Sequence, residues 1–385
     1  MKCYVIYHIH IFEDGNEDYK IIGIFSSYDE ALEVKEKYSS ELPGFKDFPE
    51  EFCIEEFEVT GLDMAKQRTV YVIFTYIYKD GKEYLDIFPL WDWRKLPGVT
   101  AFEDNAPMPL IKSYQPRNKG TFVGAVSDGK QGMTVMELDR SGVKAHKAWV
   151  CTDDFILCLG AGIQADSNLV VTTSIEQCHK NGELLSWENA RWSVVNTKQS
   201  VKGKEQRYFH NNTGYIVWGN THEVVAETAE RTGSWYDVMQ MYHPEETHGE
   251  VTAIYLTHGV APKQGTYQYL ILPGMGKENV AAFNLSDIQI LRNDATVQAV
   301  YSEGNTTCWV AAYQPVQLTV STDLILNIQT PGIYMIRKNE SGRYIISYAD
   351  PTQQRNVAEL ELNHKKVRLS LPEGKEKGKT TSIVG

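Results

Sequence analysis

The sequence lacks the features by which several classes of protein are identified. Its six cysteines form no Cys-x-x-Cys pair and no regular framework, so we interpret them as small buried side chains and expect neither a disulfide set nor a metal site. No apolar run approaches the ~18 residues of a membrane-spanning helix. The first residues, MKCYVIYHIHIFEDG, have neither the basic start nor the apolar core of a signal peptide. We therefore expect no membrane partner and, for the chain as given, a cytoplasmic location.

Basic charge is scarce as well, and the acidic excess is local. The formal net charge of the 385 residues is −12, and residues 1–61 contain 15 acidic residues against five lysines, which leaves −2 for the rest. Nucleic acid needs a basic face, so it is excluded as a partner. An acidic polysaccharide would have to bind a local cluster. Lys198, Lys202, Lys204 and Arg207 are one candidate, although a solvated loop is the interpretation that we favour.

Residues 1–61 have the pattern of a small acidic α+β domain. Alternating residues over 2–12 predict a half-buried strand, an acidic turn follows, and residues 19–25 predict a second strand. A capping box that begins at Ser27 predicts the start of a helix, and residues 52–59 predict a third strand. The predicted order of elements is therefore ββαβ.

The first predicted strand contains two histidines, His8 and His10, on one face. Their spacing is compatible with metal binding, but no third ligand is evident near them in the sequence. We therefore interpret both as surface histidines and predict no cofactor.

The rest of the chain is expected to be mainly β. From Val70 onward, short runs of β-forming residues are separated by Gly, Asn, Asp and Pro, and no segment has a helical pattern of adequate length. After a linker at residues 62–69, we predict a large domain of stacked antiparallel sheets over 70–285. A C-terminal β-sandwich is predicted over 286–370, followed by a disordered tail over 371–385.

The predicted β-region contains a series of recognisable motifs, of which the first is DIFPLWDWRKLPGVT at residues 86–100. The others follow in the order FVGAVSDG (122–129), LGAGI (159–163), VTTSIEQ (171–177), NTGY (212–215), TGSW (232–235) and DPTQ (350–353). Together they resemble the central and C-terminal β-domains of polysaccharide lyase family 8, which includes hyaluronate, chondroitin and xanthan lyases. The resemblance covers about residues 69–365 and implies a β-supersandwich followed by a C-terminal β-sandwich.

The resemblance also implies what catalysis would need. In the family, β-elimination next to a uronate uses Asn, His, Tyr and Arg side chains of an N-terminal helical toroid, and a Glu from the first strands of the β-domain. The short stretch between the acidic domain and Asp86 leaves no space for these parts. We therefore assign no catalytic residue and expect the chain to be inactive alone, with a separately encoded toroid as a potential partner. Members of the family are usually secreted or periplasmic.

Trp91, Trp93 and Arg94 are the candidate carbohydrate-binding residues. The two tryptophans lie two positions apart, so in an extended segment both would point to the same face, and a pair of aromatic faces suits the C–H surface of sugar rings. The alternative is that they belong to a buried core. His258 is interpreted as a structural turn residue, and Glu176 as a carboxylate on the surface of a strand.

Three interpretations of function stay open. The first is a non-catalytic, lyase-derived carbohydrate-binding protein with an acidic polysaccharide as its ligand. The second is the β-half of a split or truncated lyase, which would become active with a separate toroid, and which an exposed apolar docking surface would support. The third is a degraded or artificially joined gene product without a role. The first predicts affinity for a glycan, the second a protein partner, and the third neither.

Overall fold

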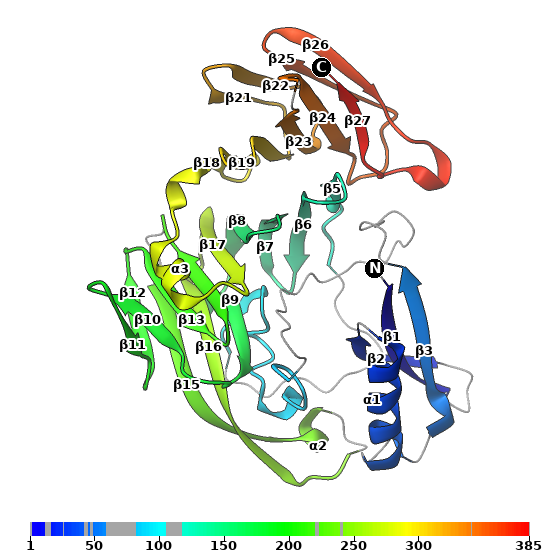
Figure 1. Ribbon diagram of the computed structural model, residues 1–385, viewed down its shortest axis with the longest axis vertical. Helices are drawn as coiled ribbons and strands as arrows, with labels where there is room; N and C mark the ends of the chain where they lie inside the picture. Colours follow the sequence, from blue (N-terminus) through cyan, green and yellow to red (C-terminus); the bar gives the residue numbers. More distant parts are fainter. Residues whose placement is uncertain are drawn as a thin grey trace. The chain divides into compact units, whose positions relative to one another are not determined.

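The computed structural model describes residues 2–11, 17–25, 27–41, 45–46, 49–58, 82–104, 118–219, 223–238, 242–339 and 341–384 (Figure 1). The predicted linker at 62–69 lies outside the described residues. The chain forms two compact units, of which the first comprises Met1–Leu62, Phe88–Leu90 and Thr232–His248. The second comprises Asp63–Ile87, Trp91–Arg231 and Gly249–Gly385. No helix in the described part is long and apolar enough to cross a membrane.

The N-terminal part of the first unit is a three-stranded antiparallel sheet with one helix. Its elements are β1 (Lys2–Ile11), β2 (Glu17–Phe25), α1 (Tyr28–Glu41) and β3 (Phe52–Glu58), and the order across the sheet is β2-β1-β3. The helix begins where the capping box predicts it, because Oγ of Ser27 accepts a hydrogen bond of 3.2 Å from the backbone amide of Glu30. The predicted ββαβ order is confirmed.

His8 is buried, so its interpretation as a surface histidine is wrong. The residue is 1% exposed, and its ring centroid lies 4.8 Å from those of Phe45 and Phe52. Its Nε2 atom lies 3.5 Å from Oε2 of Glu51. His8 shares the face of β1 with Ile6, which belongs to the core that α1 covers. The side chain of His10 lies outside the described part.

The central layer of the second unit is a nine-stranded antiparallel sheet. In order across the sheet its strands are β11 (Arg191–Val194), β10 (Leu185–Glu188), β13 (Gln206–His210), β14 (Thr213–Val217), β17 (Gly265–Pro273), β8 (Ile156–Ala165), β7 (Val143–Cys151), β6 (Gly132–Arg140) and β5 (Val123–Ser127). Central strands such as β14 are buried at every residue, because both faces of the sheet are covered.

A five-stranded sheet covers one face of the nine-stranded sheet. Its order is β12 (Gln199–Lys202), β15 (Glu223–Ser234), β16 (Glu246–Val260), β9 (Val170–His179) and β4 (Thr100–Phe102). One hydrophobic cluster fills the space between the two sheets, with Val224, Ile254 and Leu256 from the five-stranded sheet and Trp149 and Tyr269 from the nine-stranded sheet. This pair of sheets confirms the predicted supersandwich.

The C-terminal sandwich covers the other face. Its six-stranded sheet has the order β18 (Ile288–Asn293), β19 (Val297–Ser302), β20 (Thr307–Ala312), β23 (Gly332–Lys338), β24 (Tyr344–Ala349) and β27 (Thr381–Val384), and its four-stranded sheet is β21 (Val316–Ser321), β22 (Leu324–Ile328), β25 (Val357–Leu362) and β26 (Lys365–Ser370). Trp309 and Met335 of the six-stranded sheet share one hydrophobic cluster with Leu157 and Leu270 of the nine-stranded sheet. The sheets therefore stack in four layers of five, nine, six and four strands.

The C-terminal tail is ordered, so the prediction of disorder over 371–385 is wrong. Strand β27 pairs antiparallel with β24 and forms the edge of the six-stranded sheet. Just before it, Oγ1 of Thr380 accepts a hydrogen bond of 3.2 Å from the amide of Ser127 in β5. Disorder was predicted from the Lys/Gly/Thr-rich composition, but pairing with β24 and the contact with β5 hold these residues in a strand. The described residues after α1 contain only the short α-helices α2 (Trp235–Val238) and α3 (Lys277–Ala282).

Candidate functional site

Residues 91–104, called the tryptophan segment below, run along the edge of the five-stranded sheet and reach its outer face. The amide of Gly98 donates to the carbonyl of Ser174 at 3.0 Å, and the amide of Ser174 donates to the carbonyl of Val99 at 2.9 Å. Strand β4 then continues the segment as an antiparallel neighbour of β9. Strand β9 therefore positions the motif that the sequence singled out.

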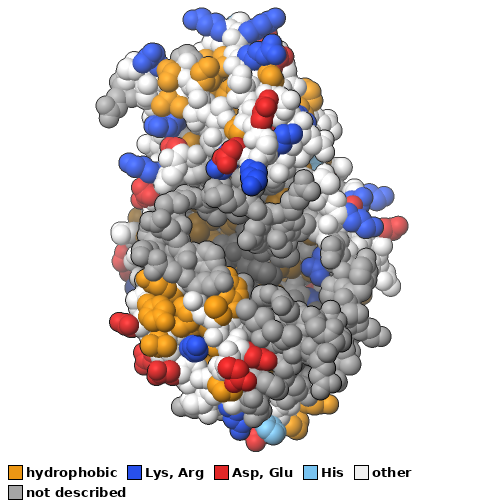
Figure 2. Space-filling model, turned by 90° about the vertical axis from the view of Figure 1, so that its right-hand side faces the viewer, with side chains coloured by type: hydrophobic (Ala, Val, Ile, Leu, Met, Phe, Trp, Pro, Cys, Tyr) orange, Lys and Arg blue, Asp and Glu red, His pale blue; other side chains and the backbone are white. Residues whose placement is uncertain are grey.

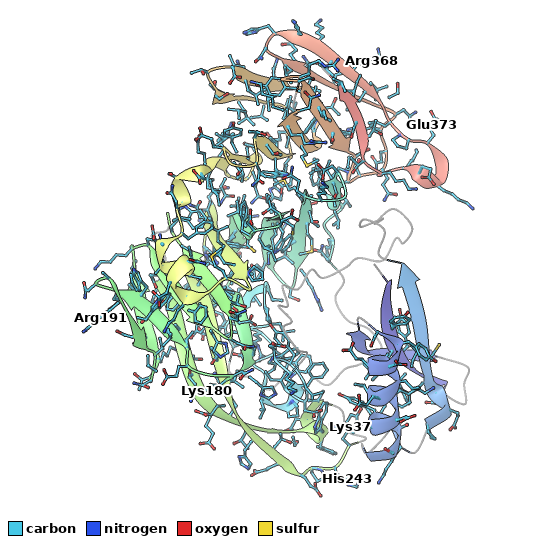
Figure 3. The ribbon with its side chains drawn as sticks, in the orientation of Figure 1. Lys37, Lys180, Arg191, His243, Arg368 and Glu373 are labelled. Atoms are coloured by element: carbon cyan, nitrogen blue, oxygen red, sulfur yellow. The ribbon has the colours of Figure 1, made fainter. Side chains whose placement is uncertain are left out.

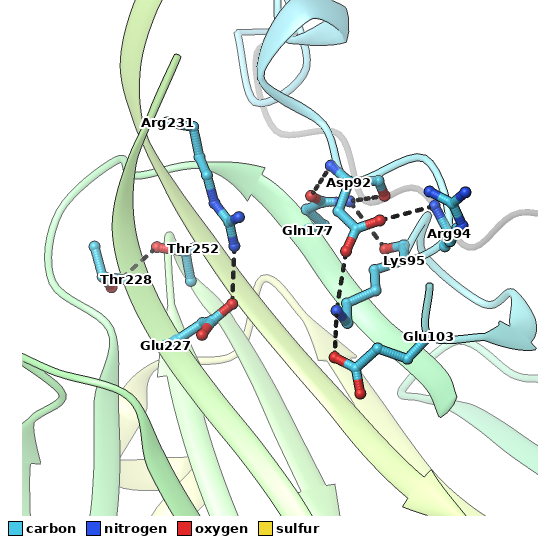
Figure 4. A network of polar contacts seen from close by, with 9 residues as sticks. All are labelled: Asp92, Arg94, Lys95, Glu103, Gln177, Glu227, Thr228, Arg231 and Thr252. Carbon is cyan, nitrogen blue, oxygen red and sulfur yellow. Dashed lines mark hydrogen bonds and ion pairs between the residues drawn. The ribbon is translucent and has the colours of Figure 1, made fainter. Parts of the chain in front are cut away.

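The side chain of Gln177 in β9 holds the first turn of the tryptophan segment. Its Oε1 accepts a hydrogen bond from the amide of Asp92 at 2.8 Å, and its Nε2 donates to the carbonyls of Asp92 and Lys95, both at 3.0 Å (Figure 4). The amide of Lys95 donates to the carbonyl of Asp92 at 2.8 Å, which closes the turn. One side chain therefore fixes three backbone groups that would otherwise need other partners.

Lys95 forms ion pairs with two carboxylates and a cation–π contact with Tyr255. Its Nζ atom lies 2.9 Å from Oδ2 of Asp92 and 2.9 Å from Oε1 of Glu103 (Figure 4). The same atom lies 4.8 Å from the ring centroid of Tyr255, and Nζ of the exposed Lys198 lies 5.7 Å from that centroid. Burial lowers the pKa of Lys95, but the hydrogen bonds to its two carboxylates outweigh this and leave the pKa raised. A hydrogen bond to Tyr255 raises the pKa of Lys198. Both lysines are therefore cationic at neutral pH.

The two candidate tryptophans do not form a flat platform. They lie in and beside a turn rather than in an extended strand, and their ring centroids are 5.5 Å apart at an interplanar angle of 88°. Trp91 is 9% exposed, and its Nε1 donates to the carbonyl of Gln177 at 3.3 Å. Trp91 thus has the structural role that was the alternative. Trp93 is half-buried and stays a candidate for sugar contact.

Arg94 is half-buried beside the tryptophans and remains a candidate for anion binding. Its guanidinium lies 3.5 Å from Oδ2 of Asp104, and its amide donates to Oδ1 of Asp92 at 3.0 Å. An ion pair of this length between partly exposed groups is weak, so a ligand carboxylate or sulfate can compete with Asp104 for the guanidinium.

Arg207 is not free to join the basic cluster considered from the sequence at Lys198, Lys202, Lys204 and Arg207. Arg207 donates to the carbonyls of Val280, Ala281 and Phe283 at 2.8 to 3.0 Å and so caps the C-terminal end of α3. Lys198 instead lies over Tyr255, as described above. On the face shown in Figure 2, acidic and basic side chains of the described residues are interspersed.

Glu176 is buried between the two sheets of the supersandwich, so its interpretation as a surface carboxylate is wrong. It is 2% exposed, and its two oxygens accept hydrogen bonds from the hydroxyls of Tyr84, at 2.7 Å, and Tyr215, at 2.9 Å. Burial raises the pKa of Glu176 to about 7. Sequence alternation failed here because the pairing of β9 with β16 shifts by one residue between Ile254 and Tyr255.

A small cavity of about 10 Å³ lies next to Glu176. It is lined by Glu83, Tyr84, Glu176, Cys178, His210, Asn211, Thr213 and Tyr215. This space is close to the minimum for one water molecule and far too small for a sugar. Burial also lowers the pKa of His210 to about 4, so this histidine is neutral at neutral pH. The cluster is therefore part of the interior and has no room for a polysaccharide.

His258 is also an interior residue, in β16 rather than in a turn. It is 8% exposed, at a register shift between Thr257 and Gly259. Its Nε2 lies 2.8 Å from Oγ1 of Thr173, which lies 2.8 Å from Oγ1 of Thr100. The acid–base groups Glu176 and His258 are thus enclosed, and so are Tyr255 and Lys95, whereas Lys198 is exposed and Arg94 and Trp93 are half-buried. In the described part of the chain, no group of three His, Cys, Asp or Glu is arranged to hold a metal ion.

Three family models match the chain. "Polysaccharide lyase family 8, super-sandwich domain" matches residues 74–284, and "Polysaccharide lyase family 8, C-terminal beta-sandwich domain" matches residues 289–359. Residues 1–66 match a domain of unknown function, DUF7336.

Curated relatives align to the β-region. Chondroitinase-AC of Pedobacter heparinus is 28% identical over 316 residues, which cover 80% of this chain and 45% of the relative. Xanthan lyase of Bacillus sp. (strain GL1) is 28% identical over 300 residues, which cover 73% of this chain and 31% of the relative. The chain therefore spans less than half the length of these relatives.

Solved structures show the same fold. A chondroitinase AC lyase, determined as enzyme–oligosaccharide complexes, superposes with a TM-score of 0.73 at 28% identity, over 78% of this chain and 45% of the other. The chondroitin AC lyase of Streptomyces coelicolor A3, in complex with chondroitin sulphate, gives a TM-score of 0.62 at 21% identity, over 78% of this chain and 41% of the other.

Proposed function

Because the chain belongs to polysaccharide lyase family 8, whose super-sandwich model matches more than half of it, we propose that its β-region binds an acidic, uronate-containing polysaccharide without cleaving it alone. The proposed binding surface is the outer face of the five-stranded sheet together with the tryptophan segment. Two similar structures, solved with an oligosaccharide and with chondroitin sulphate bound, support this class of ligand.

The grouping of cations around an aromatic ring is the observation that carries the proposal. Lys95 and Lys198 approach the ring of Tyr255 from two elements, and Arg94 lies in the same turn as Lys95. Lys95 is buried and held by two carboxylates, so the exposed Lys198 and the half-buried Arg94 are the side chains that would give charge-assisted hydrogen bonds to the carboxylate and sulfate groups of a polysaccharide. The half-buried Trp93 beside them provides a surface for the C–H face of a sugar ring.

Binding without cleavage follows from where the acid–base groups lie. β-Elimination needs a base and an acid within hydrogen-bonding reach of the substrate. The carboxyl of Glu176 and the imidazole of His258 are enclosed in the interior, and Lys95 is held by Asp92 and Glu103. We therefore assign a binding role to this face and no catalytic residue.

A second candidate function is the β-half of a lyase that works with a separate helical domain. The lengths of the relatives favour it, because this chain covers 45% of chondroitinase-AC and 31% of xanthan lyase. In this chain, residues 1–66 match a different family model. A helical partner would then supply the groups that take and give the proton, and the tryptophan segment would contribute to substrate binding.

The test combines binding with product detection. The full chain would be mixed with hyaluronan, chondroitin sulfate and xanthan, while affinity and the ultraviolet absorbance of unsaturated uronate are recorded in parallel. We expect salt-sensitive binding without a rise in absorbance. The double variant Arg94→Ala, Lys198→Ala should bind about tenfold more weakly or worse, since each lost charge-assisted hydrogen bond contributes roughly 1.5–3 kcal/mol. Arg368→Ala is the matched control, because Arg368 lies on β26 of the C-terminal sandwich and is well exposed (Figure 3).

Each outcome decides between the candidates. A rise in absorbance without an added partner would contradict the proposal and place a catalytic site in the β-region. Equal loss of affinity in Arg368→Ala would show that only net charge matters. Failure to bind any of the three polysaccharides would overturn the proposal, and recovery of cleavage on mixing with a helical lyase domain would favour the second candidate.

A further inference from the structure

A groove lies on the face of the nine-stranded sheet that is turned toward the C-terminal sandwich. The tryptophan segment lies beyond the other face, at the five-stranded sheet. It has a volume of about 220 Å³, enough for several water molecules. Its lining residues come from β6, β7, β8 and the approach to β17, with Ala295 from the turn between β18 and β19. All of these residues belong to the second compact unit, so the groove is formed within one body.

Strand register explains why polar side chains gather here. Glu137 pairs with His146, and Lys144 pairs with both Asp139 and Gln164 in neighbouring strands. By strand alternation these five residues share the face whose other members, among them Val135, Ala148 and Leu159, pack against the C-terminal sandwich. The apolar contact between the nine-stranded sheet and the C-terminal sandwich therefore ends beside these residues, and the same face of the sheet continues with polar side chains.

The ring of His146 gives the groove a rigid wall. Its ring stacks on that of Tyr313, with centroids 3.7 Å apart and an interplanar angle of 17°. The hydroxyl of Tyr313 donates to Oε1 of Gln298 at 2.7 Å, which fixes the stacked pair. Nδ1 of His146 is buried, and a hydrogen bond to the backbone of Ala295 joins this ring to the turn between β18 and β19. His146 therefore shapes the wall of the groove, and hydrogen bonds to a ligand would come from the other polar side chains that line it.

The charges of the groove select the class of ligand. Oε2 of Glu137 accepts hydrogen bonds from the amides of Thr121 at 3.0 Å and Phe122 at 3.3 Å, and Asp139 is paired with Lys144 at 3.2 Å. The two carboxylates exceed the single ammonium, so an anionic ligand is repelled. A neutral ligand with several hydroxyls is not repelled, and it can use carboxylate, ammonium and amide groups at once.

We propose that this groove binds a neutral pyranose unit, with Glu137, Asp139 and Gln164 as the groups that hydrogen-bond its hydroxyls and His146 as part of its wall. Gln264 lies at the exposed rim, opposite the sheet strands. The groove is small for an organic ligand, which fits a single sugar rather than a chain. This site is separate from the proposed polysaccharide-binding face, which takes an anionic polymer on the outer face of the other sheet.

The experiment uses the full chain and ligand-observed NMR with D-galactose, D-glucose and N-acetylglucosamine, and with D-glucuronate as the anionic comparison. We expect millimolar binding of at least one neutral sugar and no binding of glucuronate. Ala295→Trp should abolish the binding, because the Cβ of residue 295 lies directly above Gly162, 3.2 Å from where a Cβ of Gly162 would be. Gln164→Leu keeps a side chain of similar size and removes the amide of an exposed lining residue, and it should weaken binding about tenfold.

Controls keep the test independent of folding and of the other site. Gln317→Ala removes an exposed amide from β21 of the C-terminal sandwich and should bind as the parent does. The variant Arg94→Ala, Lys198→Ala should also keep its affinity for the neutral sugar. Absence of binding by every neutral sugar, equal binding of glucuronate, or unchanged binding by Ala295→Trp with an unaltered melting temperature would each overturn the inference.

Discussion

The two faces of the nine-stranded sheet are buried in different ways. The face toward the five-stranded sheet encloses ionisable side chains, of which Lys147 and Glu176 are 2% exposed. The face toward the C-terminal sandwich packs apolar residues such as Trp309 and Met335, both fully buried. In the first interior, ionisable groups are removed from water, which is unfavourable for folding. In the second, apolar side chains are removed from water, which is favourable.

The two interiors have different roles. Lys147 donates to the carbonyl of Gly98, and the carboxyl of Glu176 is bonded to the hydroxyl of Tyr84. The buried polar groups thus hold the tryptophan segment and the residues before it, so they determine geometry near the proposed binding face. The apolar interior holds no such segment and supplies stability. Variants that alter one interior at a time test this difference.

Removing the largest side chain of the apolar interior should have the largest effect. Trp309→Ala leaves a cavity in a closely packed cluster, and we expect a loss of roughly 3–5 kcal/mol in the free energy of unfolding. Urea denaturation followed by fluorescence would measure it. The loss should be the same at pH 6 and pH 9, because no ionisable group of this interior is involved. A strongly pH-dependent loss would contradict the division between the two interiors.

Lys147 should make the polar interior more stable at alkaline pH. Burial lowers the pKa of Lys147 from 10.5 to about 7 in the folded chain. The unfolded chain then binds more protons between these pH values, so the free energy of unfolding rises with pH through that window, by up to about 4 kcal/mol. In Lys147→Met this rise should be missing. Urea denaturation at several pH values from 7 to 10 would give the free energy of unfolding of the parent and of Lys147→Met. If the two values changed with pH in the same way, Lys147 would have no such role.

Glu176 should act in the opposite direction. Its folded-state pKa is raised from 4.5 to about 7, so the folded chain binds more protons in this range and the free energy of unfolding falls as pH increases. The expected fall between pH 4.5 and pH 7.5 is about 3 kcal/mol. Glu176→Gln keeps the shape of the side chain and an acceptor for one of the two tyrosine hydroxyls, has no titrating group, and should remove the fall. Denaturation curves at pH 5 and pH 7.5 would suffice, and an unchanged slope in the variant would refute the prediction.

The smallest effect is expected from the tether of the tryptophan segment. Gln177→Ala removes three hydrogen bonds to the backbone of Asp92 and Lys95 and should cost about 1–2 kcal/mol. Amide hydrogen exchange should rise in residues 92–98 and stay unchanged in the C-terminal sandwich. Polysaccharide binding should weaken with it. Gln317→Ala, which removes an exposed amide, should change stability by less than about 0.5 kcal/mol.

Much of the fold could be predicted from the sequence, and the reasons are specific. The motifs at 86–100 and 171–177 form neighbouring parts of one sheet, and strand periodicity with turn residues gives the mainly β class. Strand β27 was missed because its stability comes from pairing with β24, which is remote in sequence. Composition reports local preference and is insensitive to a partner strand.

The site was harder to predict than the fold. The motif located Arg94 and Trp93 near the cations around Tyr255, but nothing in the sequence placed Lys198 over that ring. Trp91 was among the carbohydrate-binding candidates because an extended segment was assumed, whereas the chain turns at Asp92 and the side chain is buried. Glu176 was placed on the wrong side by a single-residue register shift. Contacts between distant strands decide all of these features.

The burial of the nine-stranded sheet on both faces has a consequence for how the protein is made. Its strands are all synthesised by residue 273, while the six-stranded sheet that covers one face begins at residue 288. Until that sheet leaves the ribosome, a broad apolar surface is open to other nascent chains and to chaperones. Truncations that stop near residue 285 should accumulate as insoluble protein, and soluble yield should return only when β24 is included. The boundary between the two family models, at residues 284–289, therefore does not separate two domains that we expect to fold independently.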